Sequence, residues 1–153
     1  MSRGRSHRSV SYADLALDRF RNWPLKPCRA DCQPGRALAL CGLQIVHFHQ
    51  EDLAEVFLTR EIICRITPTL TTSGRVDVTQ DTGWVQVHLD VDGDLFLLQS
   101  LVSLAIQAND PDRLLHRPLI ADCPHAVPRI RRRTKPDLIV HGPSRRARAA
   151  DRR

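Results

Sequence analysis

Hydrophobic and polar residues alternate with different periods along residues 11–109, and the period predicts the type of secondary structure. The segment SYADLALDRFRNWP has apolar residues near helical spacing. It begins with Ser11 three residues before Asp14, a spacing typical of a capping box, and Pro24 stops it. We therefore expect a first helix here.

Three strand-like runs follow a loop, containing Pro, Cys and Gly residues, that extends to Gly35. RALAL and LQIVHFH are separated by Cys41 and Gly42, a two-residue connection that suits a tight hairpin. LAEVFLT is the third run and is reached through the turn QED. These runs predict three consecutive strands.

A second helix, a second hairpin and a last helix are predicted next. TREIICRITPTL has Thr59 as its N-cap, and Pro68 is expected to kink or end the helix. RVDVT and GWVQVHLDV alternate apolar and polar residues around the turn QDTG. DGDLFLLQSLVSLAIQAN predicts an apolar helix that is covered on most sides and capped by an Asp of DVDGD.

The order α-β-β-β-α-β-β-α predicts an α+β fold, in which an antiparallel sheet of about five strands packs with three helices. Alternating βαβ units are absent from the sequence, which argues against a doubly wound fold.

Charge and proline content divide the chain of 153 residues into three parts. Residues 1–10 carry three arginines and no acidic residue, and form a basic N-terminal arm. Residues 11–109 carry eight Lys and Arg against twelve Asp and Glu, and form the predicted domain. Residues 110–153 carry twelve against five and hold six of the ten prolines, so we expect a disordered basic tail.

Composition also limits the class of protein. The densest apolar run, LFLLQSLVSLAIQA, is interrupted by polar residues and is too short for a membrane span. No apolar segment follows the basic N-terminus as it would in a signal peptide, and five cysteines are an odd number for a disulfide framework. We expect a cytoplasmic protein with reduced thiols, no contact with membranes and no resident cofactor.

Three segments, GRALALCGLQIVHFHQEDLAEVFLT, TSGRV and GWVQVHLDVDGDLFLLQSLVSLAIQAN, resemble the short bacterial luciferase-domain family, whose function is unknown. The resemblance covers about Ser11 to Asn109 and implies the same hairpin, middle helix and last helix. It brings no catalytic residues with it. More distantly, the plan is similar to the small MmcQ/YjbR-like domains, for which nucleic-acid binding has been proposed from the shape of the fold.

The family's name does not imply light emission by this chain. A flavin-dependent luciferase resembles a TIM barrel, which needs about 250 residues. The chain also lacks the glycine patterns of Rossmann and P-loop nucleotide sites. Luciferase activity is therefore not expected.

His47 and His49 are the main candidates for chemistry. Residues two apart on a strand share a face, so both side chains can serve one site. His88 could complete a ligand-binding site if its strand lies nearby, and Cys28 or Cys32 could supply a thiolate. The sequence alone establishes none of these contacts.

The sequence favours a structural interpretation of the histidine pair, and the alternatives are a metal site and a small-ligand or proton-transfer role. In the structural interpretation, His47 and His49 would form a polar cap at the end of the hairpin, hydrogen-bonded to Glu51 or Asp52. On this interpretation the sequence assigns no metal and no catalytic residue.

Clustered arginines in the tail suit phosphate contacts that do not read sequence. The candidates for nucleic-acid binding are Arg131, Arg132, Arg133, Arg145 and Arg146. The alternative is a solvated extension, because the tail has no aromatic residue to stack on bases.

Three functions remain open. The missing catalytic motifs favour a noncatalytic binding or interaction module, which could form a homodimer through the apolar helix over residues 94–109. The second is a small enzyme or metal-binding accessory protein that uses His47 and His49. The third is nonspecific nucleic-acid binding through the basic tail.

Overall fold

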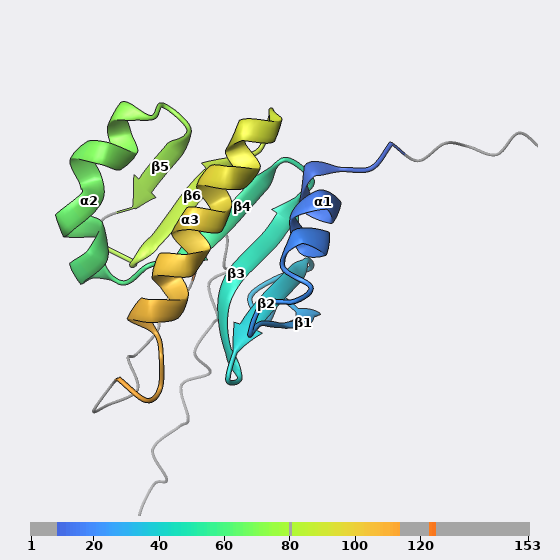
Figure 1. The fold of residues 1–153 in the computed structure, drawn as a ribbon, viewed down its shortest axis with the longest axis horizontal. Coiled ribbons are helices and arrows are strands. Elements are labelled where there is room, and N and C mark those ends of the chain that lie inside the picture. The colour runs from blue at the N-terminus through green and yellow to red at the C-terminus, as the bar shows by residue number, and fades with distance from the viewer. Residues whose placement is uncertain (1–8, 80, 114–122, 125–153) are drawn as a thin grey trace, which may run out of the picture.

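A computed structural model describes residues 9–79, 81–113 and 123–124, and its architecture is a six-stranded antiparallel sheet with three helices (Figure 1). The helices are α1 (Tyr12–Arg19), α2 (Arg60–Thr72) and α3 (Asp92–Ala108). The strands lie in the order β1-β2-β3-β4-β6-β5, with bounds β1 (Lys26–Arg29), β2 (Arg36–Leu40), β3 (Leu43–Gln50), β4 (Leu53–Phe57), β5 (Val76–Thr79) and β6 (Trp84–His88). The predicted α+β fold is confirmed.

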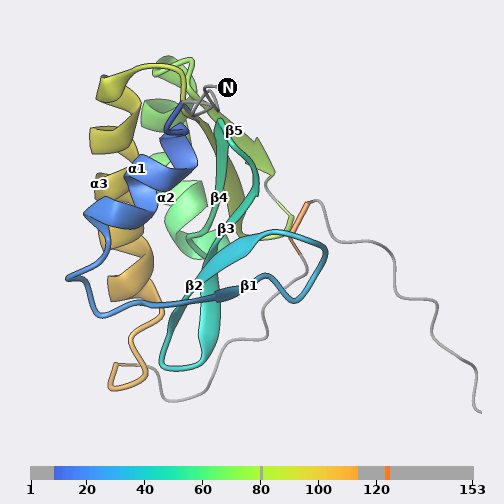
Figure 2. The ribbon, with the colours of Figure 1, turned by 90° about the vertical axis from the view of Figure 1, so that its right-hand side faces the viewer.

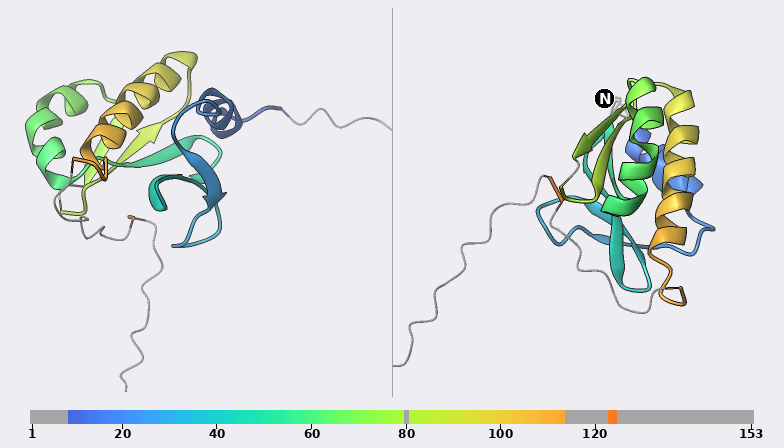
Figure 3. Two further views of the ribbon diagram at one scale, coloured as in Figure 1. Left: turned by 60° about the horizontal axis from the view of Figure 1, so that its bottom comes forward. Right: turned by 90° about the vertical axis from the view of Figure 1, so that its left-hand side faces the viewer.

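The helices form one layer and the sheet forms the other. Figure 2 and the right-hand panel of Figure 3 show all three helices on the same face of the sheet. The core fills the space between the layers, and Phe20 after α1, Ile63 in α2 and Leu98 in α3 are each at most 1% exposed. In both views the segment that contains Cys123, drawn in orange, lies on the opposite side of the sheet from the helices.

The number of strands differs from the prediction, because the sheet has six strands and not about five. The additional strand is β1, which lies in the stretch that we expected to be a loop. Its four residues, KPCR, are all exposed, so they carry no alternation of apolar and polar residues that could reveal a strand. As the edge strand it pairs only with β2, a position that tolerates Pro27.

The predicted starts of the first two helices are confirmed. The side chain of Ser11 accepts a hydrogen bond from the backbone of Asp14, and the Asp14 carboxylate accepts one in return. Thr59 is the N-cap of α2. Pro68 does not end α2, which continues to Thr72, and the Thr72 hydroxyl donates to the Pro68 carbonyl at 2.7 Å.

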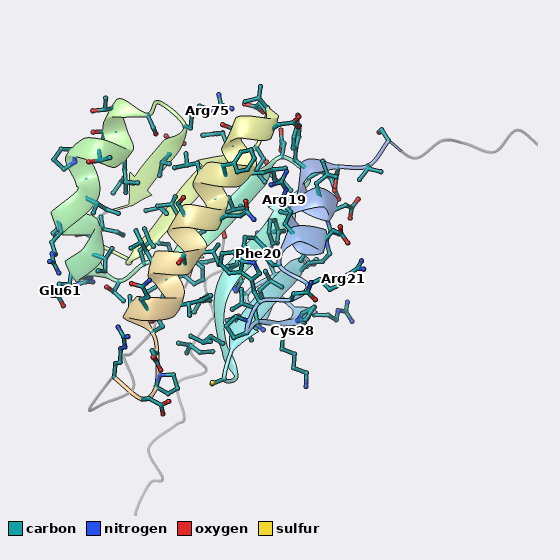
Figure 4. All side chains as sticks on the ribbon, in the orientation of Figure 1. Arg19, Phe20, Arg21, Cys28, Glu61 and Arg75 are labelled. Atoms are coloured by element: carbon teal, nitrogen blue, oxygen red, sulfur yellow. The ribbon has the colours of Figure 1, made fainter. Side chains whose placement is uncertain are left out.

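The acidic residue that stabilises the start of α3 is Asp94, in the first turn, and not a residue at the N-cap, which is Val91. Its carboxylate accepts hydrogen bonds from the backbone of Asp90 and Val91 at 2.8 and 3.0 Å. It also accepts two from Arg75, at 2.9 and 2.6 Å. Figure 4 shows Arg75 beside the end of the sheet where α3 begins. The Arg75 guanidinium lowers the pKa of Asp94 to about 2.

The predicted hairpin between β2 and β3 is confirmed. Cys41 and Gly42 connect the strands, and both have positive φ, 49° and 85°. A two-residue turn of this kind fixes which residues of β3 face each side of the sheet. The positions of the two histidines on β3 depend on that register.

Among the described residues, no helix has both the length and the apolar character that crossing a membrane would require.

Candidate metal centre

The face of the sheet that the helices leave uncovered carries a row of polar side chains. His47 pairs laterally with Ala37 on β2 and with Glu55 on β4, and Glu55 pairs with Gln86 on β6. Laterally paired residues share a face of a sheet, so His47 and Glu55 are neighbours there. The predicted proximity of His47 and His49 is also present, since their ring centroids lie 5.4 Å apart.

Four metal-ligating side chains converge on this face: Cys32, His47, His49 and Cys123. One donor atom from each lies within 4.8 Å of the other three. Cys32 Sγ is 3.4 Å from His47 Nδ1 and 3.2 Å from His49 Nε2. Cys123 Sγ is 3.3 Å from Cys32 Sγ and 3.6 Å from His49 Nε2.

Four of the six donor–donor separations are close to those of a tetrahedral set of ligands, and all six are within 4.8 Å. Zinc bonds of about 2.3 Å to sulfur and about 2.0–2.1 Å to nitrogen put neighbouring donor atoms about 3.3–3.8 Å apart in a tetrahedron. The three sulfur–nitrogen distances and the one sulfur–sulfur distance given above are 3.2–3.6 Å. Small shifts of the side chains would therefore give the geometry of a Cys2His2 site.

The His47 ring is oriented by Gln44. The Gln44 amide oxygen accepts a hydrogen bond from the backbone N–H of Asp31 at 3.1 Å, and its nitrogen donates to the carbonyl of Arg29 at 2.8 Å. That amide oxygen also lies 3.0 Å from His47 Nε2, so Nε2 carries the hydrogen. Nδ1 is then unprotonated and faces Cys32.

The His49 ring is oriented by the loop between β1 and β2. His49 Nδ1 lies 3.1 Å from the carbonyl oxygen of Pro34, which can only accept, so Nδ1 donates and Nε2 presents its lone pair to the two sulfur atoms. Gly35 allows this close approach, because a Cβ there would lie 2.5 Å from Nδ1. Both histidines therefore have the hydrogen-bonded outer nitrogen that is usual for metal ligands.

Burial keeps His47 in the neutral form that a metal requires. Its side chain packs against the indole of Trp84, with ring centroids 4.8 Å apart, and His47 is 2% exposed. Burial, and then the nearby His49, lower the pKa of His47. A neutral imidazole can bind a metal without first losing a proton.

Glu55 adds a carboxylate beside the four donors. It is 1% exposed, and its Oε2 lies 3.6 Å from His49 Nε2, the nitrogen that faces the sulfur atoms. Gln86 donates a hydrogen bond to its Oε1 at 3.3 Å. Sequence reasoning did not single out Glu55, because a single acidic residue in an otherwise apolar strand has no motif around it.

Other candidates from the sequence lie outside the cluster. His88 is on β6 and pairs with Asp77, its Nε2 lying 2.7 Å from the carboxylate. Cys28 is exposed on the edge strand β1 (Figure 4). Arg131, Arg132, Arg133, Arg145 and Arg146 lie outside the described residues.

Cys123 is the ligand that sequence reasoning missed. We assigned it to the tail, yet it is 4% exposed and packs with the buried residues of the domain, on the side of the sheet opposite the helices (Figures 2 and 3). It is 91 residues from Cys32 and forms no short-range motif with it. The odd number of cysteines was the only available signal, and it does not identify a partner.

The comparisons with known proteins agree with the predicted family over part of the chain. No curated protein and no solved structure shows significant similarity to this chain. One segment of the chain, residues 42–105, matches a family model; it contains His47, His49 and Glu55, whereas Cys32 and Cys123 lie outside it. Residues 42–105 match the family model described as Luciferase domain, which confirms the resemblance for this segment.

Proposed function

We propose that this protein is a metal-binding domain in which Cys32, His47, His49 and Cys123 hold one zinc ion. The observation that carries the proposal is the convergence of four donor atoms within 4.8 Å of one another. The outer nitrogen of each histidine is already engaged by Gln44 or Pro34, which leaves the inner nitrogen for the metal.

The chemistry of the donors favours zinc over other common metals. Two thiolates and two imidazoles in a tetrahedral arrangement are typical of zinc sites. Magnesium and calcium prefer oxygen ligands, and the four-residue cluster offers none. The two thiolates would balance the charge of a divalent ion in this buried position.

Metal binding would join parts of the chain that are distant in sequence. Cys32 lies in the loop between β1 and β2, the histidines lie on β3, and Cys123 lies 74 residues beyond His49. A bound ion would stabilise the folded state relative to the unfolded chain, because the unfolded chain does not hold these groups together.

The direct test is the metal content of the purified full chain after removal of any affinity tag. We expect one equivalent of zinc per chain by elemental analysis. The double variant His47→Ala/His49→Ala should lose it, whereas His88→Ala and Cys64→Ser should keep it. His88 is a histidine outside the cluster, and Cys64 is an exposed cysteine on α2.

Two results would contradict the proposal. The first is wild-type protein that binds no zinc when excess metal is supplied and then removed by desalting. The second is equal zinc loss in His88→Ala and in the double variant, which would show a site elsewhere or a nonspecific effect.

The remaining predictions about partners stay predictions. A homodimer through the 94–109 helix would use Phe96, which is 61% exposed with the Arg19 guanidinium 4.9 Å above its ring centre. Nucleic-acid binding would use tail arginines outside the described residues. The exposed surface of α3 lies on the face of the sheet opposite the metal centre, so such a dimer would leave the centre accessible (Figures 2 and 3).

A further inference from the structure

We propose that Cys32 and Cys123 form a reversible disulfide when the protein reacts with a hydroperoxide such as hydrogen peroxide, and that this oxidation releases the bound zinc. The release of zinc rests on the proposed metal binding, whereas formation of the disulfide depends only on the two cysteines. The inference makes the pair a redox-active site and gives the metal centre a means of regulation.

The two sulfur atoms are already in contact. Cys32 Sγ and Cys123 Sγ lie 3.3 Å apart, whereas the sulfur atoms of a disulfide are about 2.0 Å apart. The sulfur atoms therefore need to approach each other by only about 1.3 Å. Cys32 lies in the loop between β1 and β2, so a small movement of its side chain breaks no hydrogen bond between strands.

The two cysteines differ in exposure, and this difference assigns their roles. Cys32 is partly exposed, whereas Cys123 is 4% exposed. An oxidant therefore reaches the Cys32 sulfur first, and Cys123 is the cysteine that attacks the oxidised product. His47 Nδ1 and His49 Nε2 lie 3.4 and 3.2 Å from the Cys32 sulfur and leave little room around it, which favours a small oxidant such as hydrogen peroxide over a bulky disulfide.

The reaction has two steps and is balanced by the peroxide. Bound zinc holds both cysteines as thiolates, the form that attacks peroxide. The Cys32 thiolate bonds to one peroxide oxygen while the O–O bond breaks, which gives a sulfenic acid and hydroxide. The Cys123 thiolate then attacks the Cys32 sulfur, so that the S–S bond forms, the S–O bond breaks and a second hydroxide leaves. The two sulfur atoms together lose two electrons, and both peroxide oxygens become water after protonation.

Formation of the disulfide removes both thiolate ligands. The sulfur atoms of a disulfide carry no negative charge, so the ion keeps only His47 and His49 from the set of four. Zinc affinity should fall by roughly a thousandfold or more, because half of the ligands and both charged ones are lost. The disulfide replaces zinc as the link between Cys32 and Cys123, which are 91 residues apart, so this cross-link of the folded state is kept.

Reduction restores the centre from its exposed side. A thiolate reductant attacks one sulfur of a disulfide and forms a mixed disulfide, and the sulfur of the partly exposed Cys32 is the accessible one. Cys123 leaves as a thiolate, and the second thiol of a dithiol such as dithiothreitol then releases Cys32 and leaves the dithiol oxidised. Zinc binds the reduced pair more tightly than the disulfide, so zinc also opposes the oxidation.

The first test uses the full chain with Cys28→Ser, Cys41→Ser and Cys64→Ser, which leaves Cys32 and Cys123 as the remaining two of five cysteines. The zinc-loaded protein is treated with hydrogen peroxide, alkylated and analysed by mass spectrometry. We expect the loss of two hydrogen atoms per chain and a cross-linked peptide that joins Cys32 to Cys123.

Two further variants in the same background test the assigned roles. Cys123→Ser should leave Cys32 as a sulfenic acid that dimedone traps. Cys32→Ser should slow the oxidation of Cys123 by roughly tenfold or more, because the remaining sulfur is buried. Oxidation of Cys32 to sulfinic or sulfonic acid while Cys123 is present, without a disulfide, would overturn the inference. Undiminished oxidation of Cys123 in Cys32→Ser would overturn the assigned order of attack.

The second test follows zinc with a chromophoric chelator during the same reaction, with a sample that receives no peroxide as the baseline. We expect one zinc ion to be released for each disulfide formed, with the same rate constant. Reduction with dithiothreitol, desalting and addition of zinc should restore one equivalent per chain. His88→Ala, which changes a histidine outside the cluster, should release zinc at an unchanged rate.

The outcomes separate the two proposals. Protein that binds no zinc, yet forms the disulfide with peroxide in the metal-free state, refutes the metal centre and the release of zinc but supports the redox-active pair. Protein that binds zinc and keeps it after the disulfide has formed, or releases it before any disulfide appears, refutes the coupling between them. Protein that binds zinc, but forms no disulfide between Cys32 and Cys123 with or without the metal, refutes the redox-active pair and leaves the metal centre standing.

Discussion

Gln44 should control zinc affinity although it does not touch the metal. Its amide oxygen accepts from the Asp31 backbone and from His47 Nε2, and its amide nitrogen donates to the Arg29 carbonyl, with all three distances between 2.8 and 3.1 Å. Gln44→Ala removes the group that selects the tautomer of His47 and fixes its ring. The imidazole ring of His47 would then have to be oriented when the metal binds.

The expected magnitude follows from these contacts. Loss of an outer hydrogen bond to a ligating histidine typically weakens metal binding by about 10–100-fold, or about 1.4–2.8 kcal/mol. The metal-free protein should also lose about 1–3 kcal/mol of unfolding free energy, because the Nε2–H group of His47 is left without its partner in a residue that is 2% exposed. Stoichiometry should remain one ion per chain.

A chelator-competition titration measures the affinity, and urea unfolding of the metal-free protein measures the stability. Gln44→Glu keeps the acceptor oxygen for His47 but loses the donor to the Arg29 carbonyl, so it should recover only part of the affinity. The matched control is Gln99→Ala on α3, in the helix layer. Gln99 accepts a hydrogen bond from Arg19 and lies far from the metal centre, so this variant should leave the zinc affinity unchanged. Wild-type affinity in Gln44→Ala would refute the orienting role of Gln44.

Three further predictions concern the pH dependence of stability, the space beside Gly35 and the salt dependence of DNA binding. The pKa of Asp94, about 2, lies below the ordinary value of 3.8. The ionised carboxylate therefore stabilises the folded state above about pH 4, and this stabilisation is lost as the pH falls toward 2. Asp94→Asn should therefore lower the free energy of unfolding by about 1–2 kcal/mol at pH 7 and by little near pH 2; the effect at pH 7 is modest because Arg75 is partly exposed. Urea unfolding of the metal-free protein measures this difference, and an equal loss at both pH values would contradict the prediction. Gly35→Ala should weaken zinc binding at least tenfold in a chelator titration, because the new Cβ would lie 2.5 Å from His49 Nδ1, whereas Gly93→Ala, with open space around it, should not. Binding of the full chain to unrelated DNA duplexes should weaken steeply between about 50 and 200 mM salt, and equal binding after removal of the tail would refute a role for the tail arginines.

Much of the fold could be predicted because its signals are local. Ser11 and Asp14 form a capping box within four residues, and Cys41 and Gly42 form a turn between two apolar runs. Strand β1 could not be predicted, because exposed edge residues obtain their structure from pairing with β2 and not from their own pattern. The candidate site shows the same contrast between residues that a local pattern predicts and residues that only the tertiary structure brings together.

The histidine pair could be predicted because a strand places residues two apart on one face. The sequence also predicted Cys32 as one of two possible thiolate ligands. Cys123 and Glu55 could not be assigned, because their proximity to His49 depends on tertiary structure and on strand register. A site assembled across 91 residues has no spacing that a linear motif can express.

The segment that matches the luciferase-domain family supplies only part of the donor set. His47, His49 and Glu55 lie within residues 42–105, and two histidines with one carboxylate favour iron or other metals that accept oxygen ligands. Both sulfur donors come from outside that segment and shift the preference toward zinc. Cys32→Ala/Cys123→Ala should therefore reduce the ratio of zinc to ferrous affinity by at least tenfold, measured by anaerobic competition between the two ions. An unchanged ratio would show that the two cysteines do not determine which metal this domain selects.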